Sequence, residues 1–271
     1  MIRQKFTVID AHCHIYPEKI VDRAVAGTDA FYGTRAACRG VTGELLEIGE
    51  TLGIDHFVVH SVATTPKQVA SINEFIAASV ASAPQKFTGL GAIHPDCEAP
   101  EAVIRQLHEL GLHGIKIHPD IQRFPIDDVR MYPIYALCQE HGLPILMHTG
   151  DYRYDFSNPN RLLPVLKDFP SLVVIGAHFG GWSVWEDAAR VLADFPNLFV
   201  DCSSTFPFAG NDLSLGERLI ARYGAERVMF ASDFPMWSPK DELETFMKLR
   251  LTDEERRLIL SENAKRIYHI Q

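Results

Sequence analysis

Two histidines near the N-terminus are the residues whose types and spacing first suggest chemistry. His12 and His14 lie in the segment IDAHCHIYP. Residues two positions apart project from the same face of an extended strand, about 7 Å apart along it, so both imidazoles can reach one cation. Cys13, which lies between them, points to the opposite face. Taken alone, such a pair is as compatible with a structural role as with a metal site.

Further short apolar runs along the chain end in polar side chains of the kinds that bind metals. These side chains are Lys116 and His118 in IKIHPD, His148 in ILMHTGD, His178 in IGAHFGG and Asp233 in FASDFP. Nitrogen and carboxylate ligands without thiolates suit zinc, and manganese, iron or cobalt are feasible as well. The sequence therefore predicts a divalent metal centre, with Zn2+ as the first expectation and one ion rather than two.

The elements that must position these residues follow a simple alternation. Eight short apolar runs are separated by segments of helical spacing, which is the pattern of repeated βα units. The runs cover 6–10, 56–60, 87–93, 114–118, 144–148, 172–177, 198–201 and 227–231. The glycine-rich fingerprint of an open dinucleotide-binding sheet does not follow the first run. We therefore predict an α/β fold, a (β/α)8 TIM barrel, in which the polar run ends meet at one mouth.

The predicted barrel is a single domain over residues 1–271, with two additions to the repeated pattern. The stretch at about 15–40 is less regular, and we predict an enlarged first loop that covers the barrel mouth. The tail at about 251–271 has helical spacing, and we predict one or two C-terminal helices there.

These motifs resemble those of the amidohydrolase superfamily, most closely amidohydrolase family 2. That branch also contains the aminocarboxymuconate-semialdehyde and resorcylate-type decarboxylases. The matching segments are DAHCH at 10–14, GIKIHP at 114–119, ILMHTG at 145–150, GAHFGG at 176–181 and ASDFP at 231–235. Each is loose alone, but together they keep the family's order over nearly the whole chain. The resemblance implies a ligand set of His12, His14, His148 and Asp233, with His178 as a further ligand or a catalytic group beside the metal.

Lys116 has two interpretations under this resemblance. In some two-metal relatives a lysine on the fourth strand is carboxylated and bridges the ions, whereas in one-metal relatives it has no such role. His118 faces the same side as Lys116, and its position suits contact with the substrate or a metal as well as helix capping. His60 and His94, near the ends of the second and third runs, are weaker candidates.

From this site we predict a metal-dependent hydrolase that acts on an amide, ester or lactone of a small organic molecule, carboxylated or not. A bound cation lowers the pKa of water to about 7. Asp233 would take the proton of that water and return it to the leaving group, and His178 would donate a hydrogen bond to the oxyanion. The alternative is a non-oxidative, metal-dependent decarboxylase of the same superfamily. The motifs barely separate the two reactions, and chain length weakly favours hydrolysis.

Loops after the strands are predicted to bind the substrate. Arg153, in the segment TGDYRYDFSNPNR, can pair with a substrate carboxylate through two hydrogen bonds, and Tyr152 can pack on a ring. The alternative for this segment is an exposed loop with ordinary ion pairs. Trp182, Arg123 and His118 complete the predicted substrate contacts.

Composition limits the partners. The net charge of −9 and the absence of a strongly basic run argue against nucleic acid. A TatD-like metal nuclease is disfavoured for that reason and because Lys116 stands where such proteins have a glutamate. A barrel that has lost catalysis is disfavoured because no expected ligand position is substituted. We expect no membrane contact and a cytoplasmic location, since no apolar run has the length of a membrane span and no signal peptide is recognisable. A homodimer is compatible with the sequence.

Overall fold

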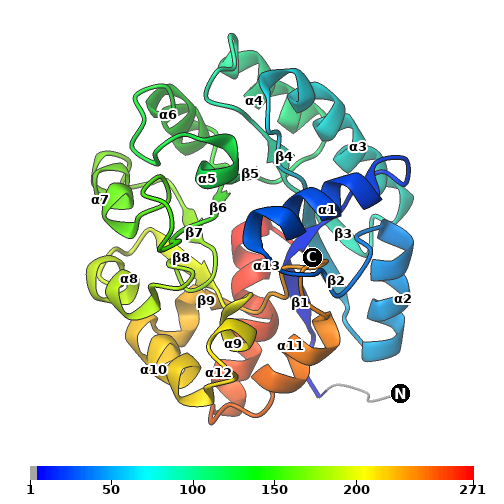
Figure 1. The fold of residues 1–271 in the computed structure, drawn as a ribbon, viewed down its shortest axis with the longest axis vertical. Coiled ribbons are helices and arrows are strands. Elements are labelled where there is room, and N and C mark those ends of the chain that lie inside the picture. The colour runs from blue at the N-terminus through cyan, green and yellow to red at the C-terminus, as the bar shows by residue number, and fades with distance from the viewer. Residues whose placement is uncertain (1–4) are drawn as a thin grey trace.

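A ring of parallel strands surrounded by helices forms the centre of the computed structural model, which describes residues 5–271 (Figure 1). Residues 1–4 of the predicted domain lie outside the described residues. The strands are β1 (Ile9–His14), β2 (His56–His60), β3 (Phe87–Gly89), β4 (Gly91–Ala92), β5 (Ile115–Ile117), β6 (Ile145–Met147), β7 (Val174–Gly176), β8 (Leu198–Asp201) and β9 (Val228–Met229). Every pair of neighbours in the two sheets, β1-β2-β3 and β4 to β9, is parallel.

The two sheets join into one barrel at two junctions. At the first, β3 and β4 form one continuous run: the Leu90 amide donates to the Val59 carbonyl, and the next amide, that of Gly91, donates to Gly114 on the other side. At the second, β1 meets the segment after β9, where the Ala11 amide donates to the Phe230 carbonyl over 3.0 Å. The predicted (β/α)8 barrel is therefore confirmed, with β3 and β4 together serving as its third strand.

The junction of β1 with the end of β9 also carries a buried side-chain link. The Asp10 carboxylate accepts hydrogen bonds from the Ser232 amide, over 2.9 Å, and from the Ser232 hydroxyl, over 2.5 Å. Burial raises the pKa of Asp10 to about 6, and the two bonds from Ser232 oppose that rise. This link fixes the position of β1 along the barrel axis relative to the segment that ends in Asp233.

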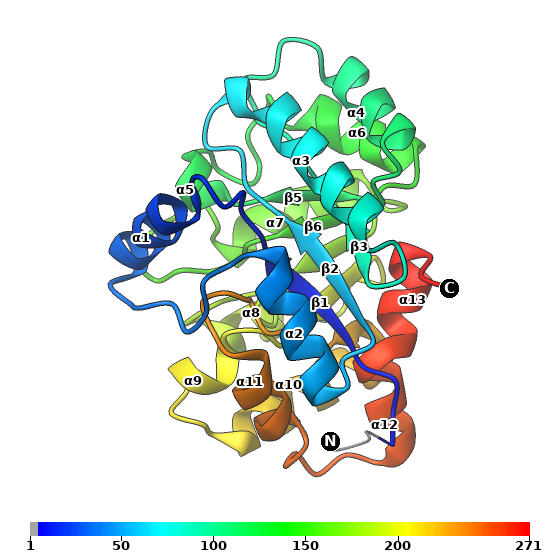
Figure 2. The ribbon, with the colours of Figure 1, turned by 90° about the vertical axis from the view of Figure 1, so that its right-hand side faces the viewer.

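Helices surround the strands, and two of them cover the opposite ends of the barrel. The helices are α1 (Val21–Tyr32), α2 (Thr42–Leu52), α3 (Val69–Ser82), α4 (Pro100–Glu109), α5 (Pro119–Gln122), α6 (Tyr132–Glu140), α7 (Pro159–Asp168), α8 (Trp185–Leu192), α9 (Thr205–Phe208), α10 (Leu213–Tyr223), α11 (Pro239–Phe246), α12 (Asp253–Arg257) and α13 (Asn263–Tyr268). Figure 2 shows α1 at the end where the strands finish and α13 at the other. Between residues 5 and 271, no helix has both the length and the hydropathy needed to cross a membrane.

The region at about 15–40 differs from its predicted form. It contains a twelve-residue helix, α1, and not only a loop. This helix ends at Gly33, whose φ of 66° is the left-handed conformation that glycine adopts without strain. Residues of α1 line the cavity at the barrel mouth. The tail holds α12 and α13, joined by a short π-helical stretch, Leu258–Glu262.

Side chains alternate along the strands between the barrel interior and the surrounding helices, as a strand's two-residue period requires. The inward-facing apolar residues pack with α13 in one cluster: Ile9, Ala11, Val58, Leu90, Leu146, Ile175, Ala177, Phe199, Met229, Ala231, Ala264, Ile267 and Tyr268. The outward-facing residues, such as Val59 and Ile115, belong to a larger cluster that includes the helices. The lower part of the barrel is therefore filled with apolar side chains.

An extra residue in β1 explains how the histidine pair faces the interior. Asp10 pairs with Phe57, whereas Cys13 pairs with Val59, so three steps along β1 match two along β2. Such a bulge moves the side chains that follow it to the other face of the strand. Ile9 and Ala11 face inward before it, and Cys13 then packs outward with the helices. His12 and His14 are thereby directed to the interior.

We predict that Asp10→Ala lowers the free energy of unfolding by about 1–3 kcal/mol, because it leaves buried donors of Ser232 without an acceptor. Urea denaturation measures the change. Ser232→Ala is the comparison variant: it removes the hydroxyl bond to Asp10 and the acceptor of the Phe234 amide, but keeps the bond from the Ser232 amide to Asp10, and it should cost less. An Asp10→Ala protein as stable as the wild type would show that this link does not hold the barrel closed.

Candidate metal centre

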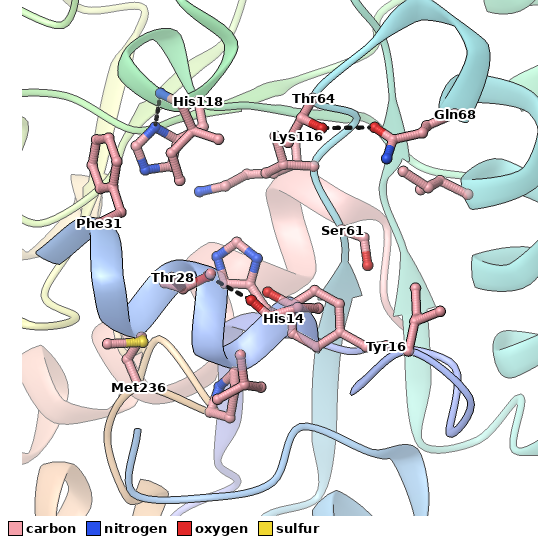
Figure 3. Close-up of a pocket in the computed structure, with 18 of the residues that line it drawn as sticks. His14, Tyr16, Thr28, Phe31, Ser61, Thr64, Gln68, Lys116, His118 and Met236 are labelled. Carbon is pink, nitrogen blue, oxygen red and sulfur yellow. Dashed lines mark hydrogen bonds between the residues drawn. The ribbon is translucent and has the colours of Figure 1, made fainter. Parts of the chain in front are cut away.

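Polar side chains replace apolar ones at the last inward-facing positions of the strands. His14 at the end of β1 pairs in register with His60 at the end of β2. Lys116 on β5, His148 after β6 and Asp201 at the end of β8 are all buried at the same level of the barrel. Figure 3 shows His14 and Lys116 pointing toward a common space, beside His118 and beneath α1. The barrel therefore has a polar layer directly above its apolar floor.

Three donor atoms in this layer form a nearly equilateral triangle. Nε2 of His12 lies 3.3 Å from Nε2 of His14, and Oδ1 of Asp233 lies 3.3 Å and 3.4 Å from these two nitrogens. Ligand atoms bound to zinc at 2.0–2.1 Å in a tetrahedron are about 3.4 Å apart. The three residues therefore fit a small divalent cation without rearrangement.

Asp201 fixes which nitrogen of the His12 ring carries the proton. Nδ1 of His12 lies 2.9 Å from Oδ2 of Asp201, a fully buried carboxylate. Burial alone would raise the pKa of Asp201, but His12 and further hydrogen bonds hold it below its usual range. An ionised Asp201 accepts a hydrogen bond from the N–H group at Nδ1, which leaves the Nε2 lone pair of His12 for a metal. Burial and Lys116 lower the pKa of His12 to about 4, so the ring is neutral.

Two more histidines, His148 and His178, lie beside the triangle. His178 directs Nδ1 to the Ser203 carbonyl, 3.1 Å away, and its Nε2 lies 3.1 Å from Nδ1 of His148. The His178 ring stacks on that of His12, with centroids 5.5 Å apart. The other nitrogen of His148 lies 3.7 Å from the Asp120 carboxylate, whose pKa burial raises to about 6. His148 and His178 are thus close to the triangle, and their part in metal binding stays a prediction.

The backbone at the site is held in an uncommon conformation. His178 and Asp233 have φ values of 59° and 60°. Residues other than glycine adopt this left-handed region at a cost, and such positions persist where the surrounding structure enforces them. Both residues belong to the predicted metal and catalytic groups, so part of the backbone strain lies at the site, while Arg123, Asn211 and His269 adopt similar φ values elsewhere.

Lys116 is buried within the same cluster. Its Nζ lies 3.0 Å from Nε2 of His12, and burial lowers the pKa of the amine to about 8. An amine with this pKa is partly neutral near pH 8, which is the form that carboxylation of a lysine requires. The bridging role considered for Lys116 stays a prediction.

A cavity of about 760 Å³ opens above the cluster. Its floor is formed by the polar layer, and its cover comes largely from α1. The apolar part of its lining consists of Pro17, Ile20, Ala24, Val25, Phe31, Val62, Ile72, Phe75, Ile121, Pro235 and Met236. Among the described residues that line it, Asp233 is the one carboxylate. The cavity therefore places a largely apolar lining next to the donor atoms, with the charged Lys19 and Arg23 also on its wall.

His118 caps a helix and holds a tyrosine that the sequence analysis did not identify. Nδ1 of His118 accepts a hydrogen bond from the Ile121 amide at the start of α5, so its other nitrogen carries the proton. That nitrogen donates to the hydroxyl oxygen of Tyr32, 2.7 Å away. The hydroxyl hydrogen of Tyr32 remains for a ligand in the cavity, which both residues line. Tyr32 was missed because it lies in the stretch predicted as an irregular loop.

The other residues predicted to contact the substrate do not line the main cavity. Arg153 does not line the cavity: its guanidinium pairs with Asp151 over 2.7 Å and donates to the Phe31 carbonyl over 2.9 Å, so it fastens α1 instead. Tyr152 is 75% exposed, and Arg123 is exposed just after α5; neither reaches the cavity. Trp182 is buried in a small pocket that also contacts His178 and Asp233.

Comparison with known proteins places this barrel in a family. The family model described as Amidohydrolase matches residues 9–270, so the chain belongs to the amidohydrolase family. A 2-amino-3-carboxymuconate-6-semialdehyde decarboxylase of Dictyostelium discoideum is 30% identical to it over 147 residues. That match covers 51% of this chain and 38% of the relative, so the chain spans well under two thirds of the relative's length.

Two solved structures show the same fold at low sequence identity. A 5-carboxyvanillate decarboxylase from Sphingomonas paucimobilis has a TM-score of 0.75 and 18% identity, covering 98% of this chain and 100% of that one. A dihydroxybenzoic acid decarboxylase from Polaromonas sp. JS666, with bound manganese and the inhibitor 2-nitroresorcinol, has a TM-score of 0.74 and 17% identity, covering 98% and 97%. Together with the donor atoms above, these findings support a divalent metal ion without identifying zinc.

The prediction that this chain is primarily a hydrolase is wrong. The relative matched by sequence and these structures are decarboxylases. The findings favour the alternative of non-oxidative decarboxylation. The physical reason for the error is that the motifs describe the residues that hold the ion, which both reactions share.

We predict that Asp201→Asn weakens metal binding about 10- to 100-fold, the usual effect of losing such a partner. Oδ1 of Asp201 accepts from the backbone amides of His178 and Ser203, so an asparagine would keep its oxygen there. Its amino group would then face Nδ1 of His12 and force the proton to Nε2. Chelator competition with Mn2+ or Zn2+ measures the affinity, and the melting temperature of the metal-free protein checks the fold. An unchanged affinity would contradict the proposed role of Asp201.

Proposed function

We propose that this chain is a metal-dependent, non-oxidative decarboxylase of a small conjugated or aromatic carboxylate. The observation that carries the proposal is the triangle of His12, His14 and Asp233 on the floor of a largely apolar cavity. The activities named for its relative and for the similar structures supply the reaction type. Its partner is a small molecule, and the ion is Mn2+ or Zn2+.

The apolar side chains that cover the cavity favour loss of carbon dioxide over addition of water. A carboxylate has a concentrated charge that water stabilises, whereas the departing group becomes neutral as its electrons spread into the conjugated system. Removing water therefore raises the energy of the bound carboxylate more than that of the transition state. The apolar side chains contributed by α1, such as Ala24 and Phe31, provide that exclusion of water.

The metal centre would be held by His12, His14 and Asp233, with His148 and His178 next to them. A bound divalent ion supplies positive charge that holds the substrate and stabilises negative charge developing on it. Asp201 keeps the His12 lone pair directed to the centre. Tyr32 donates its hydroxyl hydrogen to a substrate oxygen, while His118 fixes the direction of that hydroxyl.

Asp233 is the group proposed to carry the proton. Burial would raise its pKa, but His12, His14 and His178 hold it well below the usual range, so Asp233 begins as a carboxylate. It takes a proton from a hydroxyl or amino group of the substrate on binding. As the bond between the carbon and the carboxylate breaks, the electron pair remains on that carbon and Asp233 returns the proton to it. Carbon dioxide leaves, and no water is consumed.

The first test of this function is the product. We expect Mn2+- or Zn2+-loaded protein to release carbon dioxide from at least one of 2,6-dihydroxybenzoate, 5-carboxyvanillate and 2-amino-3-carboxymuconate 6-semialdehyde. Removal of the ion with a chelator should abolish release, and readdition should restore it. Ester and lactone analogues serve as controls. Hydrolysis of these analogues with no release of carbon dioxide would overturn the proposal.

The second test concerns Asp233. We predict that Asp233→Asn lowers the rate of carbon dioxide release at least about 100-fold, the scale of a lost proton-transfer group. The metal content of the variant, measured by elemental analysis, separates loss of the proton carrier from loss of the ion. A variant that keeps its metal and its rate would remove Asp233 from the proton-transfer role.

A further inference from the structure

His60 is a buried histidine whose two ring nitrogens have no hydrogen-bond partner among the described residues. An imidazole carries at least one N–H group, and a buried donor or acceptor left unpaired costs about 1–3 kcal/mol. Buried groups of this kind are usually satisfied by something other than protein, such as an ordered water or an ion. The side chain therefore needs a partner that the polypeptide does not supply.

The position of His60 places it against the metal centre. It ends β2 and pairs in register with His14, so the two side chains project to the same, inward side. The His60 ring lies 4.4 Å from the ring of His14 and 4.9 Å from that of His12, edge-on to both. One nitrogen from each of these three histidines lies within 4.8 Å of the others. The unpaired ring thus borders the same space as the donor triangle.

A second buried histidine on the same strand shows what a structural histidine looks like here. His56 begins β2, and both of its nitrogens have partners: the Thr88 hydroxyl at 2.8 Å and the Gln85 carbonyl at 3.3 Å. Of these two histidines, His60 is the one whose nitrogens are left for a bound ion.

We infer that His60 is a ligand of the metal centre, which would then receive nitrogens from β1 and β2 as well as the Asp233 carboxylate. His60 does not line the cavity, whereas His12, His14 and Asp233 do. It would therefore approach the ion from the barrel side and leave the cavity side open for a substrate. The inference rests on the metal centre that the proposed function also requires, but not on the reaction.

The experiment compares His60→Leu with His56→Leu. Metal affinity is measured by chelator competition with Mn2+ on the metal-free proteins, and pulsed electron paramagnetic resonance of the Mn2+-loaded proteins detects the coordinated imidazole nitrogens. We expect His60→Leu to bind Mn2+ at least about tenfold more weakly and to lose one imidazole signal, in line with the loss that even outer partners cause. The metal-free His60→Leu protein should melt no lower than the wild type, because two unpaired polar atoms are removed.

His56→Leu should show the opposite pattern. It breaks two hydrogen bonds, so its melting temperature should fall while its Mn2+ affinity and imidazole signals stay unchanged. His60→Gln serves as a second variant if His60→Leu does not fold. Wild-type affinity and an unchanged set of signals in the His60 variants would overturn the inference and leave the proposed function intact. A wild-type protein that takes up no metal would overturn both, whereas metal binding without carbon dioxide release would count against the proposed function alone.

Discussion

The junction between the first strand and the segment after the last strand is the constraint on which the site depends. His12 and His14 come from β1, and Asp233 follows β9, so their donor atoms meet only because the barrel closes there. The buried bonds from Ser232 to Asp10 fix the height of the two segments, and the bulge in β1 turns both histidines inward. A triangle with sides of 3.3–3.4 Å tolerates little slippage at this junction.

Much of this arrangement could be predicted from the sequence, because strands that are parallel and closed bring their ends together. The period of two along β8 and β2 also leads from inward-facing Phe199 to Asp201 and from inward-facing Val58 to His60, so both residues carried a usable signal. Tyr32 carried none, because its position depends on how α1 crosses the mouth. The pairing of Arg153 with Asp151 was equally hidden, since a loop arginine binds whichever carboxylate the fold brings near.

The choice between the two reactions shows where motif reasoning stops. The histidines and the aspartate prepare an ion for either chemistry, and nothing in their spacing distinguishes attack by water from loss of carbon dioxide. The distinction lies in what stands over the ion. In this chain that is α1, a helix that lines the cavity with Ala24, Val25 and Phe31, in a stretch predicted to be an irregular loop. The residues above the metal site, and not the metal ligands, supply the physical reason to expect a reaction that consumes no water.

The apolar plug beneath the cluster has a consequence for traffic through the barrel. Within residues 5–271, inward side chains fill the lower half and Tyr268 of α13 packs with them. A molecule in the cavity therefore enters and leaves at the end of the barrel where the strands finish. In the proposed reaction, carbon dioxide and the larger product would both leave at that end. Slow release of the larger product would keep carbon dioxide near the reactive carbon and favour the reverse reaction, carboxylation.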